Sequence, residues 1–111
     1  MTTPRVGRAV RGSRSGRPIM VVLGLLGRRA ALRVLWELRG PALTFRALQE
    51  AAATNPALLN TRLKELREAG VVDHGEGGYF LTDAGRALMK ALTPLSDWAS
   101  AWSRSVRKAA G

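Results

Sequence analysis

The sequence predicts a mainly α-helical domain of the α+β class, in which one short β-hairpin interrupts a series of helices. Apolar residues recur at intervals of three and four along most of the chain after residue 18, as on the buried face of a helix. A run of turn residues, DHGEGG at 73–78, separates two short apolar segments, which is typical of a tight hairpin. Residues suited to helix caps, such as Thr44, Asn55 and Thr82, precede several of the periodic segments.

The composition limits the class of protein. The chain has 111 residues, the length of one domain, and a formal net charge of +10 from 18 Lys and Arg against 8 Asp and Glu. A chain this basic binds polyanions unless something prevents it, so nucleic acid or an anionic membrane surface leads the expected partners. The absence of cysteine excludes disulfides and thiol redox switching. With one histidine and no paired nucleophile and base, we expect no metal site, no cofactor and no enzymatic activity.

The apolar run IMVVLGLLG, residues 19–27, is far shorter than the roughly 20 residues that a membrane span needs. Arg28 and Arg29 follow it at once, and the helical periodicity continues without a break suited to signal-peptide cleavage. We therefore expect no membrane association and a cytoplasmic location.

Residues 1–18 are expected to form a disordered basic arm, and residues 19–111 the folded domain. The arm is rich in Gly, Ser and Pro and has no acidic residue, so it cannot offset the entropy of ordering by burial. It carries five arginines: Arg5, Arg8, Arg11, Arg14 and Arg17. We expect them to lie along DNA phosphates or to enter a minor groove, and a purely solubilising tail is the alternative.

Two helices are expected in the first third of the chain. The first covers residues 19–27 and has an apolar face at i, i+3, i+4 and i+7: Ile19, Val22, Leu23 and Leu26. Gly24 and Gly27 weaken this helix, so it should depend on packing against another surface. The second helix runs from about Arg28 to Arg39 and stops at Gly40-Pro41.

A third helix, FRALQEAAA at 45–53, follows the N-cap residue Thr44. Asn55 followed by Pro56 is a stronger start signal, because Asn caps well and Pro suits the first helical position. The fourth helix places three leucines on one buried face: Leu59, Leu63 and Leu66. It ends at Gly70, where a left-handed residue is favoured.

Two short strands, Val71-Val72 and Tyr79-Phe80-Leu81, are expected around the glycines of the hairpin. Thr82 then caps a last helix over 83–108, whose apolar residues recur close to a heptad pattern: Leu88, Leu92, Leu95, Trp98, Trp102 and Val106. Pro94 should kink this helix.

Three short helices, a two-stranded hairpin and a further helix in this order predict a winged helix-turn-helix with a long C-terminal dimerisation helix. In this geometry the helix at 56–69 enters the DNA major groove, and the hairpin, or wing, flanks it near the backbone.

Three segments of the chain resemble the HxlR-type winged-helix transcriptional regulators: LLGRRAALRVLWELRGPALTFRALQEA, LLNTRLKELREAGVV and YFLTDAGRAL. The last two are also similar to the wider group of MarR-like and ArsR-like regulators. The resemblance spans about Pro18 to Trp98 and implies a DNA-binding regulator.

The chain departs from the HxlR pattern in three places. Arg17 stands where the family often has a cysteine, so thiol sensing is excluded. The wing DHGEGG is short and carries no Lys or Arg, whereas the family's wing is usually longer and often basic. Pro56 and Ala57 occupy the start of the recognition helix, where the family often has polar residues.

Candidate DNA contacts lie off the leucine face of the fourth helix. Asn60 and Arg62 suit bidentate contacts to adenine and guanine, and Thr61 and Lys64 suit phosphate. The alternative is a solvated face with Arg62 paired to Glu65 or Glu50, so at most half of these four should touch a base. The full expected set is Asn55, Asn60, Thr61, Arg62, Lys64 and Arg46, with Arg5, Arg8, Arg11, Arg14 and Arg17 of the arm.

The first and last helices have more apolar surface than one small core can bury, so we expect a homodimer on a pseudo-palindromic operator. The expected interface comprises Ile19, Val22, Leu23, Leu26, Leu92, Leu95, Trp98 and Trp102. Trp36 could join Trp98 and Trp102 around an unidentified small-molecule effector, but core or interface packing is the more common role of such residues. An architectural protein that binds double-stranded DNA without sequence preference is the alternative function.

Overall fold

The computed structural model describes residues 17–110 of the chain. This part folds into α1 (Pro18–Leu26), α2 (Ala31–Glu37), α3 (Phe45–Ala51), α4 (Pro56–Glu68), β1 (Val72–Gly75), β2 (Gly78–Leu81) and α5 (Asp83–Ala110). The predicted fold class is confirmed, since this order of helices, hairpin and long final helix is that of a winged helix-turn-helix. Four arginines of the predicted arm, Arg5, Arg8, Arg11 and Arg14, lie outside the described residues.

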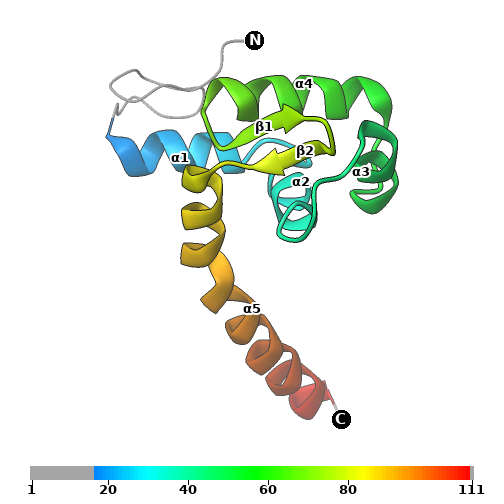
Figure 1. Cartoon of the computed structure of the whole chain (residues 1–111). Coiled ribbons are helices and arrows are strands. Elements are labelled where there is room, and N and C mark those ends of the chain that lie inside the picture. Colours follow the sequence, from blue (N-terminus) through cyan, green and yellow to red (C-terminus); the bar gives the residue numbers. More distant parts are fainter. Residues whose placement is uncertain (1–16, 111) are drawn as a thin grey trace.

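The first four helices and the hairpin gather into one body, and the C-terminal part of α5 projects well beyond it (Figure 1). The core lies where α2, α3 and α4 meet the hairpin, and its fully buried side chains include Leu35, Leu48, Leu59, Leu66 and Val72. Within residues 17–110, no helix is long and apolar enough to cross a membrane.

Both ends of α4 follow local sequence signals. The Asn55 side chain accepts a hydrogen bond from the backbone N–H of Leu58 at 2.8 Å, and Pro56 occupies the first turn, where its missing N–H costs nothing. Gly70 has φ +80°, the left-handed conformation expected just after a helix. Thr44 likewise accepts from the N–H of Ala47 at 3.2 Å and caps α3. The predicted caps are therefore confirmed.

Two predicted helices are shorter in the structure. The helix predicted from Arg28 begins only at Ala31, because residues 27–30 form a turn in which Ala30 has φ 70°. The helix predicted over 45–53 ends at Ala51, and Ala53 has φ 53°. The apolar periodicity runs through both turns, and alanine gives no local signal for a left-handed conformation, so the sequence did not indicate these breaks.

The hairpin pairs antiparallel strands from Val72 opposite Leu81 to Gly75 opposite Gly78, which leaves Glu76-Gly77 as a two-residue turn. Val71, predicted in the first strand, precedes it instead. Its N–H donates to the Leu66 carbonyl at 3.1 Å, which closes the end of α4.

A third segment joins this sheet, which the sequence did not predict. Leu43 and Tyr79 exchange two backbone hydrogen bonds, of 3.0 and 2.7 Å, and so tie the connection between α2 and α3 to β2. The close approach requires glycine at residue 78, where φ is +112° and an added Cβ would lie 2.3 Å from the Leu43 carbonyl oxygen.

Thr82 links the hairpin to α5. Its hydroxyl accepts from the N–H of Gly85 at 3.1 Å, as predicted for an N-cap, and donates to the Gly70 carbonyl at 2.6 Å. Met89 of α5 is buried in the core. Pro94 lies inside the helix, which changes direction part-way along its length in Figure 1. The predicted kink is consistent with this bend, because proline removes one helical hydrogen bond.

We predict that Gly78→Ala destabilises the protein by about 3 kcal/mol, since the methyl group would meet the Leu43 backbone and alanine is strained at this φ. Gly40→Ala is the control, because a Cβ there meets nothing within 4 Å, and it should change the free energy of unfolding by less than about 0.5 kcal/mol. Urea unfolding at one fixed protein concentration measures both. Equal effects of the two substitutions would contradict the prediction.

Candidate nucleic-acid interface

The outward face of α4 is polar and exposed, as a recognition helix requires. Asn60, Thr61 and Lys64 are all exposed, whereas the leucines on the opposite face are buried in the core. The Thr61 hydroxyl donates to the Ala57 carbonyl at 3.1 Å, which leaves its oxygen as an acceptor only. Lys64 and Asn60 also offer donors on this face.

Arg62 does not belong to this face, and its predicted contact with guanine is wrong. It is only 7% exposed. Its Nε donates to the Arg29 carbonyl at 2.7 Å, and its Nη1 donates to Glu65 at 2.6 Å. The pairing with Glu65 is the alternative that the sequence had left open. A buried guanidinium with these partners cannot reach a base without breaking them.

Glu65 holds α4 against the turn between α1 and α2. It is 4% exposed, and its second carboxylate oxygen accepts from Nη1 of Arg28, which lies in that turn. A carboxylate buried this deeply is tolerated because two guanidinium groups compensate its charge. The cluster of Arg28, Arg62 and Glu65 therefore determines which face of α4 turns outward.

Asn55 and Arg46 are exposed near the starts of α4 and α3. The Asn55 side-chain oxygen accepts the capping hydrogen bond, and its amide N–H groups are donors available to DNA. Arg46 forms no ion pair within the described residues and fits the predicted phosphate contact. Arg17, the described arginine of the arm, is exposed beside α1, and its carbonyl accepts from the N–H groups of Met20 and Val21.

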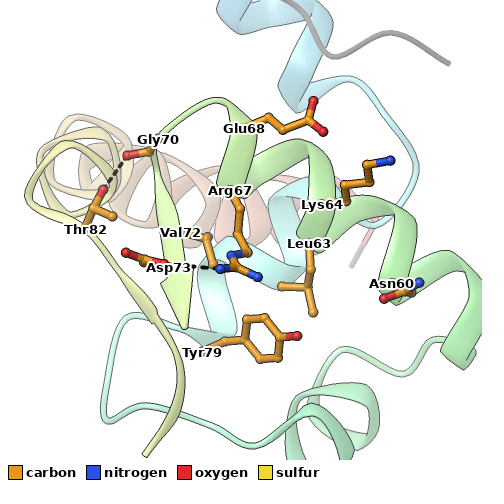
Figure 2. Close-up of a pocket in the computed structure, with 10 residues that line it drawn as sticks. All are labelled: Asn60, Leu63, Lys64, Arg67, Glu68, Gly70, Val72, Asp73, Tyr79 and Thr82. Carbon is orange, nitrogen blue, oxygen red and sulfur yellow. Dashed lines mark hydrogen bonds and ion pairs between the residues drawn. The ribbon is translucent and has the colours of Figure 1, made fainter. Parts of the chain in front are cut away.

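A cleft of about 560 Å³ lies between α4 and the hairpin (Figure 2). Its lining brings Asn60 and Lys64 together with residues that the sequence did not indicate as DNA contacts: Arg67, Asp73, Tyr79 and Thr82. The Nη2 of Arg67 lies 3.6 Å from the Asp73 carboxylate. The spacing of Asn60, Lys64 and Arg67 along one helix face was the signal that could have identified Arg67.

The wing is short, acidic and folded against the body. Asp73, His74 and Glu76 are exposed along it, and the His74 ring packs against Tyr79 with the ring centres 4.5 Å apart. A Cβ added at Gly77 would lie 3.5 Å from the Cβ of Ala42, so the turn lies against the connection between α2 and α3. Such a wing has little reach for a minor groove.

Most of the predicted dimer residues are outside the core. On α1, Val21 and Leu25 are buried, whereas Ile19 and Leu23 are 58% and 53% exposed and Val22 and Leu26 are partly exposed. The helix is apolar on nearly all sides, so it can bury one face and present another.

The second half of α5 presents the larger apolar surface. Leu95, Trp98, Trp102 and Val106 are 47% to 59% exposed, and the two tryptophan rings stack with their centres 5.8 Å apart. Leu92, like Leu26 of α1, packs partly against the core.

The three tryptophans do not meet in one pocket of the described chain. Trp36 lines an apolar groove of about 320 Å³ between α2 and α5, together with Leu32, Met89, Leu92 and Leu95. The Arg39 guanidinium covers the Trp36 ring at 3.5 Å. Trp98 and Trp102 lie farther along α5.

Residues 17–110 contain no group of three or more His, Asp or Glu side chains arranged to hold a metal ion.

Residues 25–107 match the family model of the HxlR-like helix-turn-helix. The chain belongs to this family. The resemblance seen in the sequence is thereby confirmed, and the HxlR-like chain is a DNA-binding transcriptional regulator. None of the curated proteins compared with the chain matches it significantly.

Solved structures agree with the family assignment. A possible HxlR family transcriptional factor from Thermoplasma volcanium GSS1 is 26% identical over 78% of this chain and 85% of its own, with a TM-score of 0.68. Quinone-bound YodB from B. subtilis is 30% identical over 75% and 96%, with a TM-score of 0.65. The Mycobacterium tuberculosis MarR family protein Rv2887 is 27% identical over 80% and 79%, with a TM-score of 0.59.

For this HxlR-like domain we predict that Glu65→Gln lowers the free energy of unfolding by about 3 kcal/mol, because two guanidinium groups would lose the carboxylate that compensates them. Glu50→Gln, on the exposed surface of α3, makes the same chemical change and should cost less than about 0.5 kcal/mol. Urea unfolding compares the two variants. A Glu65→Gln protein as stable as the Glu50→Gln control would show that the cluster does not hold α4.

Proposed function

We propose that the chain regulates transcription by binding a pseudo-palindromic operator as a homodimer, with α4 in the major groove. The observation that carries this proposal is the division of α4 into an inner face fixed by leucines and Glu65 and an outer polar face that is free. A helix of this kind fits the major groove, where base pairs present distinct patterns of donors and acceptors.

The proposed contacts differ in kind. Asn60 is the candidate for reading a base, because its amide can donate to and accept from adenine. Lys64 and Arg46 are exposed cations suited to phosphate. Asn55 and Thr61 can add weaker polar contacts beside them. Arg62 is omitted because it is buried.

The basic arm would add affinity without specificity. Its arginines, Arg5, Arg8, Arg11, Arg14 and Arg17, would follow the phosphate backbone or enter a minor groove. Each phosphate contact releases counterions, so the affinity from the arm should fall as salt rises. This division of roles leaves sequence reading to α4.

The homodimer is supported by apolar surface on α1 and α5. A soluble monomer rarely exposes a row of side chains such as Leu95, Trp98, Trp102 and Val106, each about half exposed. Two copies related by a two-fold axis could bury these rows and place their α4 helices on half-sites one helical turn apart, roughly 10 base pairs.

An effector would have to act without a thiol. YodB was solved with a quinone bound, but this chain has no cysteine and so cannot form a covalent bond to an electrophile through sulfur. The groove between α2 and α5 is lined mostly by apolar side chains, together with Arg33 and Ser96, and suits an apolar molecule. The cytoplasmic location expected for such a regulator stays a prediction.

An architectural role without sequence preference is the second candidate. It is favoured by the start of α4, where Pro56 and Ala57 are exposed and offer no polar side chain to a base. The two functions differ in what they demand of Asn60, since only a regulator needs it to discriminate between bases.

We predict that selection of bound fragments from random duplex DNA returns a two-fold-related motif. With Asn60→Ala, preference should weaken at one position in each half-site by about 1–3 kcal/mol, because one bidentate contact is lost. The measurement is sequencing of fragments retained at several salt concentrations. No motif from the unmodified protein, with affinity falling uniformly as salt rises, would favour the architectural role instead.

We also predict that Trp98→Glu converts the dimer into a monomer, because a charge would be buried in the proposed interface. Arg104→Glu is the control, since Arg104 is two residues beyond Trp102 and therefore about 200° around the helix from it. Analytical ultracentrifugation at low salt measures the mass of each protein. A monomer for the unmodified chain would refute the dimer, and a monomer for the control would show a general charge effect.

A further inference from the structure

The cleft between α4 and the hairpin lies where a DNA strand must pass if α4 occupies the major groove. The major and minor grooves are separated by one sugar–phosphate strand, so a strand next to a helix in the major groove runs between that helix and the wing beside it. This placement rests on the proposed function. The position of the cleft makes it a candidate binding site for a phosphodiester group.

Two cations line the cleft, but one of them is engaged. Lys64 is exposed, and the Nη2 of Arg67 lies 3.6 Å from Oδ1 of Asp73 on β1. Figure 2 shows Arg67 reaching from α4 towards Asp73, whereas Glu68 points to the other side of the helix. The Asp73 carboxylate therefore lies where a phosphate oxygen would meet Arg67.

The Asp73 carboxylate is held in this position by its own strand. The backbone N–H of His74 donates to Oδ1 of Asp73 at 2.8 Å, the same oxygen that faces Arg67. The ion pair itself is loose, because the Arg67 and Asp73 side chains are 48% and 56% exposed and the distance is long. A phosphate can bind the planar guanidinium through two hydrogen bonds and is the stronger partner.

We propose that Asp73 is an internal competitor for the DNA phosphate, so that Arg67 binds the backbone only after leaving the wing carboxylate. The competition lowers the affinity for every duplex, because all duplexes present phosphate. In a chain with a net charge of +10, it limits backbone binding that would otherwise hold the protein on any DNA.

The test is Asp73→Asn, measured by fluorescence anisotropy with a labelled duplex long enough for two half-sites. The amide keeps the size of the side chain and an oxygen for the His74 N–H, and removes only the charge. We expect binding about three- to fivefold tighter at low salt. The slope of log K against log salt should change by less than roughly 0.9, the value for one phosphate contact, because Arg67 makes that contact in both complexes.

The matched control is Glu76→Gln, which removes the same charge from the exposed turn of the same wing without touching Arg67. It should have a clearly smaller effect. In an Arg67→Gln background, Asp73→Asn should no longer tighten binding, because the side chain for which Asp73 competes is gone. Thermal unfolding of each variant confirms that it is folded.

Three results would overturn the inference: no gain from Asp73→Asn, an equal gain from Glu76→Gln, or a gain that persists without Arg67. The last two would mean that only the net charge of the wing matters. These outcomes are distinct from failure of the proposed function, in which the unmodified protein would not bind the duplex at all.

Discussion

The orientation of the recognition helix depends on one buried carboxylate. Glu65 joins Arg62 of its own helix to Arg28 in the turn before α2, and all three side chains are shielded from water. Removing one partner from such a cluster leaves an uncompensated charge, so the cluster is stable only when it is complete. Together with the leucines on the inner side of α4, it leaves a single face of that helix exposed.

The exposed side chains of the described chain form two separate surfaces, one polar and cationic and the other apolar. Polar and cationic side chains gather on α4 and beside the hairpin, where the acidic wing moderates the positive charge. Apolar side chains gather on α1 and on the distal part of α5. In the proposed dimer the hydrophobic surface would be removed from water, and in the proposed complex the cationic surface would face DNA. Dimerisation and DNA binding can therefore use separate parts of one small fold.

Local sequence signals predicted the helices and strands, whereas contacts between distant residues determined how these elements pack together. Asn55 and Thr82 marked helix starts because a capping side chain acts within three residues of itself. The pairing of Leu43 with Tyr79 was not predicted, since the two residues are far apart in the chain and a single paired residue leaves no periodic pattern. The pairing of Arg62 with Glu65 had been an alternative on a solvated face, but its burial was not predicted, because the Arg29 carbonyl that Arg62 also contacts belongs to a distant turn.

By itself the sequence determined the order of helices and hairpin, the basic character of the chain, the absence of thiol chemistry and the family. These properties follow from composition and from spacing along the chain. Only the tertiary structure decided which polar residues of α4 face outward and that Arg67 faces Asp73 across a cleft. Helical spacing shows which side chains share a face, but burial and charge pairing depend on what the rest of the chain packs against that face.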